Sequence, residues 1–192
     1  MRKRFFGNYL GYSYYYGGGD GNPSITTDYD KNIVGYETNE TVGFVGTNNI
    51  ETNYYITESD GFELYIAGTF DSSTARFGTL INAMDESDST YPGFCIRKSS
   101  SGQWKIYYGD YSTAVSTTNP TDFQIKIAKP ANNRTATVTW LDGSTQQETT
   151  FTISLTFSSK TKITLGSSVD SSGGYLRYAI ATVTKFYVKK TA

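Results

Sequence analysis

The chain has 192 residues and a formal net charge of −1, with no histidine and a single cysteine. The lack of histidine excludes Ser–His–Asp and Cys–His nucleophile systems and every His-ligated metal site. The single cysteine excludes an intrachain disulfide and a cysteine-based zinc site. The near-neutral charge argues against nucleic acid as a partner, and no apolar run approaches the roughly 20 residues that a membrane span needs.

The composition is typical of an all-β protein. The chain has 28 threonines and 20 serines, and aromatic residues make up 16% of it. Because β-branched and aromatic side chains favour strands, and disordered chains hold few of them, we expect a folded β domain. We divide the chain into an N-terminal arm and linker (1–32) and one β domain (33–192).

The N-terminal arm begins with three cations and continues as a Tyr- and Gly-rich stretch without an apolar core segment, so we expect a retained arm rather than a signal peptide. Two hypotheses stay open for it: a free tail, which its terminal position favours, and an arm that docks on a partner, which its many aromatic residues favour. In the docking hypothesis aromatic side chains anchor the arm and cations set the encounter rate. The expected docking residues are Arg2, Lys3, Arg4, Phe5, Phe6, Tyr9 and Tyr12.

Beyond the arm, apolar and polar residues alternate with a period of two, which predicts antiparallel strands with one buried face. No segment shows a helical pattern. The predicted strands lie near 33–36, 42–45, 48–57, 61–70, 77–84, 91–98, 103–108, 122–129, 134–141, 147–157, 161–166 and 175–189. The residues expected in the core are Phe62, Leu64, Ile66, Phe123, Ile125, Ile127, Val138, Trp140, Phe151, Ile153 and Leu155.

Turn residues separate these runs. The pair Asp142-Gly143 predicts a hairpin, because this dipeptide tolerates the positive φ angles of a tight turn. Many short strands joined by such turns are typical of a sandwich or barrel. Cys95 lies within a strand-like run and is expected to be a small buried residue.

The order of several strings resembles the laminin-G-like and concanavalin A-like lectin and glucanase modules. The strings are VGFVGTNNIET (42–52), DGFELYI (60–66), GTLI (78–81), GFCI (93–96), GQWKI (102–106), TVTWLDG (137–143), TKITLG (161–166) and RYAIATV (177–183). The resemblance implies a two-sheet antiparallel jelly-roll sandwich with an extended N-terminal arm. Ala181 stands where the family usually has glycine in its closing strand. Because this fold carries lectins, hydrolases, lyases and structural modules, function must be argued from sites.

The available chemistry favours binding over catalysis. Glycoside hydrolysis needs two facing carboxylates, and the E-x-D-x-E string of related glucanases is absent. Asp85 and Asp88 lie in a predicted loop, where a solvated loop is the simpler interpretation and a calcium site the weaker alternative. No catalytic residue, cofactor or further metal ligand is predicted.

Sugar binding needs exposed aromatic side chains with polar neighbours. The candidates are Tyr107, Tyr111 and Trp104, although Trp104 alternates with Ile106 and so shares the face expected to be core.

Two function hypotheses follow. In the first, the chain is a non-enzymatic structural and adhesion protein of a bacteriophage particle (a head or tail accessory or fibre protein), docked by its arm and released by lysis. It would contact other virion proteins and cell-surface glycans, form a homo-oligomer, and bind neither nucleic acid nor membrane. In the second, it is a bacterial carbohydrate-binding module or carbohydrate-active enzyme of the same fold.

Overall fold

A computed structural model provides the structure of the chain and describes residues 25, 35–38, 41–57, 59–71, 78–84, 93–98, 103–108, 112–116, 122–153, 161–169 and 174–191. Within these residues every regular element is a strand, in agreement with the all-β prediction. None of them forms a helix with the length and apolar character that crossing a bilayer requires. The strands are β1 (Gly35–Thr38), β2 (Val42–Val45), β3 (Ile50–Ile56), β4 (Gly61–Phe70), β5 (Gly78–Met84), β6 (Gly93–Lys98), β7 (Trp104–Tyr108), β8 (Ser112–Ser116), β9 (Asp122–Lys129), β10 (Thr135–Asp142), β11 (Thr145–Thr152), β12 (Thr161–Leu165), β13 (Ser168–Val169), β14 (Tyr175–Leu176) and β15 (Ile180–Thr191).

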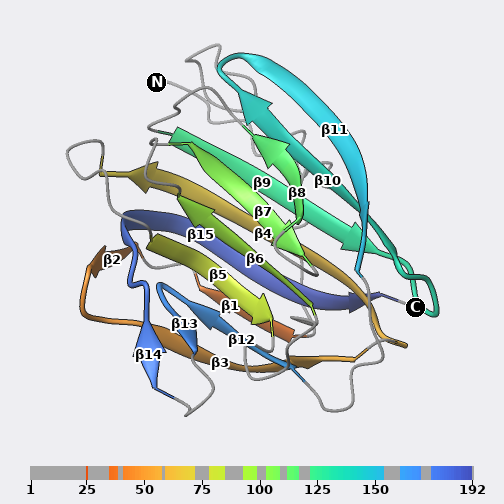
Figure 1. The fold of residues 1–192 in the computed structure, drawn as a ribbon, viewed down its shortest axis with the longest axis horizontal. Helices are drawn as coiled ribbons and strands as arrows, with labels where there is room; N and C mark the ends of the chain where they lie inside the picture. The colour runs from red at the N-terminus through yellow and green to blue at the C-terminus, as the bar shows by residue number, and fades with distance from the viewer. Residues whose placement is uncertain are drawn as a thin grey trace, which may run out of the picture.

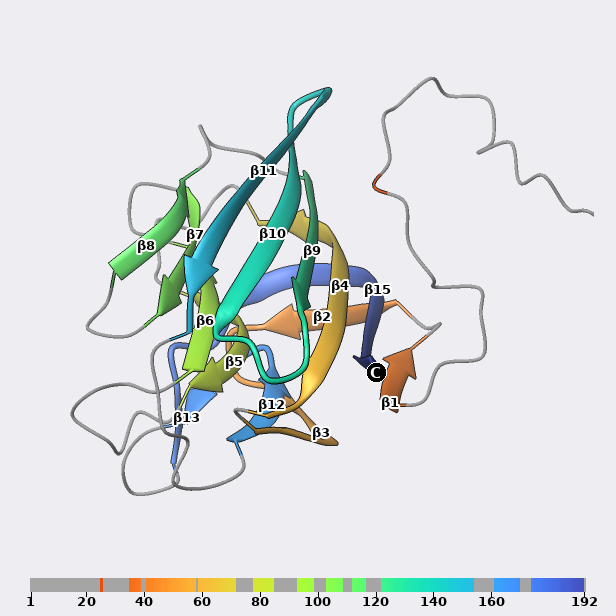
Figure 2. The same cartoon turned by 90° about the vertical axis from the view of Figure 1, so that its right-hand side faces the viewer.

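The strands form two large antiparallel sheets that pack face to face as a sandwich (Figure 1). The seven-stranded sheet has the order β1-β15-β4-β9-β10-β11, with β2 also paired to β15. The six-stranded sheet has the order β3-β12-β5-β6-β7-β8, and β13 and β14 form a separate pair. Seen from the side, the two sheets are distinct layers, so each has one inner face and one outer face (Figure 2).

The inner faces of both sheets supply the core, as the alternation predicts. Nine of the expected core residues are at most 3% exposed: Phe62, Leu64, Ile66, Phe123, Ile125, Ile127, Val138, Phe151 and Ile153. Trp140 is only partly buried and packs against the edge of this core, and Leu155 lies outside the described residues. Trp104 and Trp140 meet edge to face with ring centroids 6.4 Å apart, which closes the sandwich near β7 and β10.

A bulge shifts the pairing register of the long strand β15. Its register against β4 shifts between Val183 and Lys185, so that Thr184 is an extra residue in the pairing. Before the bulge Ala181 and Val183 face the core, and after it Phe186 and Val188 do. The same strand pairs with β2 before the bulge and with β1 after it, so one edge of β15 holds two separate strands.

The predicted hairpin forms between β10 and β11, but its centre lies one residue later than expected. Asp142 pairs with Thr145, which leaves Gly143 and Ser144 as the loop. Gly143 has a φ of 61°, while Ser144 is not among the residues with positive φ. A two-residue loop with glycine first is the type II′ arrangement, so the glycine and not the aspartate takes the left-handed position.

Two short strands, β8 and β13, were not predicted from the sequence, and the strand predicted at 175–189 is divided into β14 and β15. The strand β8 reads Ser-Thr-Ala-Val-Ser and has no alternating apolar residues, and β13 and β14 have two residues each. Only pairing with neighbouring strands identifies such segments.

Candidate functional site

The outer face of the six-stranded sheet carries a continuous row of polar side chains. Strand register places Thr164 of β12 beside Asn82 of β5, Asn82 beside Cys95 of β6, and Cys95 beside Tyr107 of β7. Because neighbours directly opposite in register point to the same side of a sheet, these residues share one face. Their strand neighbours Ile81, Ile96 and Ile106 belong to the core, so the row lies on the face turned away from it. Thr164, Asn82 and Cys95 are buried on that face, whereas Tyr107 is partly exposed.

A cationic group lies next to this row. Arg97 of β6 pairs in register with Lys105 of β7 and with Thr79 of β5. Its Nε donates a hydrogen bond to Thr79 Oγ1 at 3.1 Å, and its guanidinium lies 5.7 Å from the centre of the Tyr107 ring. Arg97 is buried, whereas Lys105 and Tyr107 are partly exposed. The buried guanidinium therefore backs the ring, and the two partly exposed side chains reach the surface.

Arg97 and Lys105 are like charges directly opposite each other across two strands, an arrangement that destabilises a sheet. Within the described part of the chain, no ion pair involves Lys105. Lys105 is therefore the cation of this face that is open to a negatively charged group bound from outside. We call Arg97, Lys105 and Tyr107 the β6–β7 site.

Two further polar groups lie on this face. Burial raises the pKa of Tyr107, the nearby Cys95 thiol adds to the increase and the charge of Arg97 opposes it, so the phenol stays a neutral donor at pH 7. Asn82 is buried and donates from Nδ2 to the carbonyl of Met84 at 3.0 Å, while its Oδ1, also buried, has no hydrogen-bond partner among the described residues.

A second tyrosine–cation pair lies at the other end of the same face. Tyr55 of β3 is 43% exposed, and Lys162 of β12 lies 5.9 Å from its ring centre. Here Glu51 forms an ion pair and a hydrogen bond with Lys162 Nζ, which raises the pKa of this lysine. This cation is thus already neutralised by the chain, in contrast to Lys105 of the β6–β7 site.

The predicted sugar-binding residues lie in different places in the structure. Trp104 is 0% exposed and sits between the sheets, so the prediction of a surface role for it is wrong: it alternates with Ile106 on the inner face. Tyr107 is on the outer face, as its alternation predicts. Tyr111, the calcium candidates Asp85 and Asp88, and all seven expected docking residues of the arm lie outside the described residues. Sequence reasoning missed Arg97, Lys105 and Asn82, whose juxtaposition depends on strand register.

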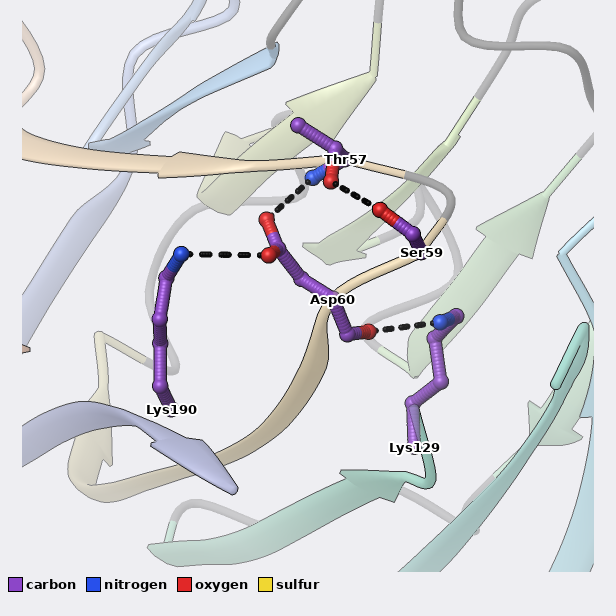
Figure 3. Close-up of polar contacts among 5 residues, drawn as sticks. All are labelled: Thr57, Ser59, Asp60, Lys129 and Lys190. Atoms are coloured by element: carbon purple, nitrogen blue, oxygen red, sulfur yellow. Dashed lines mark hydrogen bonds and ion pairs between the residues drawn. The ribbon is translucent and has the colours of Figure 1, made fainter. Parts of the chain in front are cut away.

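A third polar cluster has a structural role (Figure 3). The turn between β3 and β4 is closed by the Asp60 carboxylate, which accepts hydrogen bonds from Thr57 N at 2.9 Å and from Lys190 Nζ at 3.1 Å. The buried Lys129 donates to the main-chain oxygen of Asp60 at 2.6 Å. These bonds join the β3–β4 turn to the ends of β9 and β15.

Electrostatics agree with a structural role for Asp60. Burial raises the pKa of its carboxyl, but hydrogen bonds from Thr57 and Lys190 and the Lys190 charge outweigh burial and lower the pKa overall. Burial and the Asp60 charge raise the pKa of Tyr54 to about 12. Among the described residues, no group of three potential ligands could hold a metal ion.

No protein-family model and no curated protein matches this sequence. Solved structures match in fold. The CBM40 module of the Ruminococcus gnavus IT-sialidase matches with a TM-score of 0.52 and 7% identity, over 80% of this chain and 90% of that module. The same module bound to α2,3-sialyllactose matches with a TM-score of 0.50 and 8% identity.

Whole sialidases match over a part of their length. The NanB sialidase of Streptococcus pneumoniae matches with a TM-score of 0.54 and 11% identity, over 82% of this chain and 26% of that enzyme. A Trypanosoma rangeli sialidase complex matches with a TM-score of 0.54 and 14% identity, over 79% of this chain and 25% of the enzyme. The chain thus spans about a quarter of these enzymes and most of a CBM40 module. At these identities the likeness defines the class by fold alone: a lectin-like antiparallel β-sandwich.

Proposed function

We propose that this chain is a non-catalytic carbohydrate-binding module that recognises an acidic glycan through the β6–β7 site. The observation that carries the proposal is Lys105, partly exposed and without an ion pair among the described residues, beside the Tyr107 ring on the outer face of the sheet. Lys105 would pair with the carboxylate of the sugar. The edge and hydroxyl of Tyr107 would contact the sugar ring, since Arg97 lies over one face of the aromatic ring.

The fold comparison supports a binding role over an enzymatic one. The chain corresponds to nearly the whole of a CBM40 module, whose complex contains the acidic trisaccharide α2,3-sialyllactose, and to only a quarter of the sialidases. Among the described side chains of the outer six-stranded face, Glu51 is the one carboxylate, and it is paired with Lys162. Hydrolysis by paired carboxylates would need a second one within about 5–10 Å.

The bacteriophage hypothesis stays a prediction. It depends on docking by residues 2–12, which lie outside the described residues, and no observation on the described residues favours it over the binding module.

The proposal is tested by calorimetric titration of the full chain with 3′-sialyllactose, and with lactose as the uncharged comparator. We expect binding of the acidic sugar and at least tenfold weaker binding of lactose. Tyr107→Ala should weaken binding at least tenfold, whereas Tyr55→Ala, the matched tyrosine at the other end of the face, should change it less than twofold. Equal effects of the two substitutions, or no binding of any acidic oligosaccharide on a glycan array, would overturn the proposal.

A further inference from the structure

The outer face of the seven-stranded sheet carries an apolar patch among charged residues. Tyr65 and Ala67 of β4, Leu141 of β10 and Tyr187 of β15 form a cluster separate from the core, and each is at most 8% exposed. The rings of Tyr65 and Tyr187 lie 5.7 Å apart. Charged side chains border the patch.

The border is an ion cluster around Glu63. Lys126 and Lys189 lie 3.5 Å and 3.6 Å from its carboxylate oxygens, and the Tyr187 hydroxyl donates a hydrogen bond to it. An apolar patch with such a rim is typical of a contact surface rather than of a solvated sheet face.

The fifth member of the cluster is Ile25, from the segment that precedes β1. Its side chain is 4% exposed against the patch, and its backbone N–H donates to Gln124 Oε1 of β9 at 3.2 Å. The Tyr65 hydroxyl donates to the same oxygen at 3.4 Å, so one amide positions both the segment and the ring. Since Tyr65, Leu141 and Tyr187 point away from the core, Ile25 lies on the outer side of the seven-stranded sheet.

The chain length between Ile25 and β1 allows this contact within one molecule. β1 and β9 are separated by β15 and β4, which puts them about 14 Å apart across the sheet. The ten residue steps from Ile25 to Gly35 (35 − 25) span up to about 35 Å when extended. The short loop also makes closure in the same chain favourable over capture of a second copy.

We propose that this outer face is the mounting face of the module, on which the N-terminal segment of the same chain is anchored by Ile25. The folded unit therefore begins at or before residue 25, ahead of the boundary at residue 33 that composition predicts. Whatever is joined to the chain before Ile25 is attached on the side opposite to the β6–β7 site. The part of the proposal that concerns this orientation rests on the proposed function, whereas the anchoring of Ile25 does not.

Cross-linking of the full chain tests the anchor. In a Cys95→Ala background, Ile25→Cys combined with Leu141→Cys should cross-link within one chain when a short bismaleimide is added. Ile25→Cys combined with Tyr55→Cys, whose second position is exposed on the opposite face, should not. A cross-link between two chains would overturn docking within one molecule. An equal cross-linking yield in the two double-cysteine variants would show that Ile25 is not held against the patch.

A second measurement does not depend on the cysteine variants. Ile25→Asp should expose Tyr65, so that nitration of this tyrosine by tetranitromethane is at least fivefold faster than in the matched variant Ile25→Val. Equal rates would overturn the anchor.

Orientation is tested by titrating the cross-linked protein with 3′-sialyllactose. An affinity within twofold of that of the uncross-linked protein supports the placement of the N-terminal segment and the β6–β7 site on opposite faces. A loss of affinity confined to the cross-linked form would overturn this placement. If neither form binds the sugar, the proposed function fails while the cross-linking result still decides the anchor.

Discussion

The two outer faces of the sandwich both carry lysine and tyrosine side chains, but the partners of these side chains differ between the faces. On the seven-stranded sheet Lys126 and Lys189 flank Glu63, and Ile25 covers the apolar patch. On the six-stranded sheet Arg97 and Lys105 oppose each other beside Tyr107, and Lys105 has no ion pair among the described residues. On the first face the chain itself pairs these lysines, and on the second we propose that Lys105 pairs with a bound anion.

This difference shows how to choose between faces of a sandwich when no ligand is known. Lysines and tyrosines on strands are common for reasons of solubility and strand propensity, so their presence alone carries little information. What distinguishes the β6–β7 site is a partly exposed lysine, Lys105, that faces another cation and has no ion pair among the described residues.

The largest expected effect comes from a substitution in the core, which supports both outer faces. Phe94 is 0% exposed and contacts Phe62 and Phe151 at ring distances of 5.9 Å and 6.1 Å. Phe94→Ala should destabilise the fold by about 3–5 kcal/mol, as measured by urea unfolding. Sugar binding and the protection of Tyr65 from nitration should then be lost at the same denaturant concentration. Loss of one before the other would mean that the two faces do not share a core.

A substitution in the patch should separate stability from binding. Leu141→Ala should lower the free energy of unfolding by about 2 kcal/mol, because a buried leucine is truncated beside Ile25. The affinity for acidic sugar should stay within twofold. The neighbouring outward residue gives the control: Thr139→Ala should change stability by less than about 0.5 kcal/mol. A large loss of affinity in Leu141→Ala would show that the faces are coupled.

The Asp60 turn gives a pH-dependent effect that belongs to neither face. Because folding lowers the pKa of Asp60, its charge contributes stability that is fully present above the unfolded value of about 3.9. The contribution is lost as the pH falls through the lower folded value. Asp60→Asn should therefore cost about 1 kcal/mol at pH 7, since Lys190 is largely exposed. Urea unfolding at pH 7 and pH 3 should show the difference from the natural chain shrinking at the lower pH; a constant difference would contradict it.

The smallest expected change in stability tests the charge argument directly. Lys105→Gln should leave the free energy of unfolding within about 0.5 kcal/mol of the natural chain, since it removes a like-charge neighbour of Arg97. Affinity for 3′-sialyllactose should fall about three- to tenfold and become less sensitive to salt. The same substitution on the other face, Lys126→Gln, should not change affinity. Matching losses in both variants would point to a general effect of net charge.

Sequence patterns predict the parts of the molecule that depend on local alternation. Phe62, Leu64 and Ile66 could be assigned to the core because a single strand already separates its two faces. Tyr107 could be placed outward for the same reason. Trp140 was the exception, since it lies near the edge of the sandwich where the inner face is only partly covered.

What the sequence could not predict depends on which strands become neighbours. Arg97 and Lys105 lie on consecutive strands, but their direct opposition requires the register of β6 and β7. Lys129 continues the inward-facing series of β9, and the hydrogen bond that its buried ammonium donates to the Asp60 carbonyl comes from a distant turn. Ile25 is an isolated apolar residue in a polar stretch, and nothing in its own segment indicates the patch that receives it.

The bulge at Thr184 makes this protein sensitive to how many residues β15 contains, and not only to which ones. Gly68 faces the bulge so closely that a Cβ there would come within 2.0 Å of the Thr182 carbonyl oxygen. Deleting the extra residue, Thr184, would give a regular ladder with Phe186 still opposite Ile66 on the inner face. If one residue were instead inserted between Lys185 and Phe186, the side chains that follow would exchange sides, turning Phe186 and Val188 to solvent and Tyr187 toward the core. That single change would break the core, the patch that receives Ile25 and the pairing with β1. A one-residue insertion after the bulge is therefore expected to be highly damaging, and insertions should be confined to the loops.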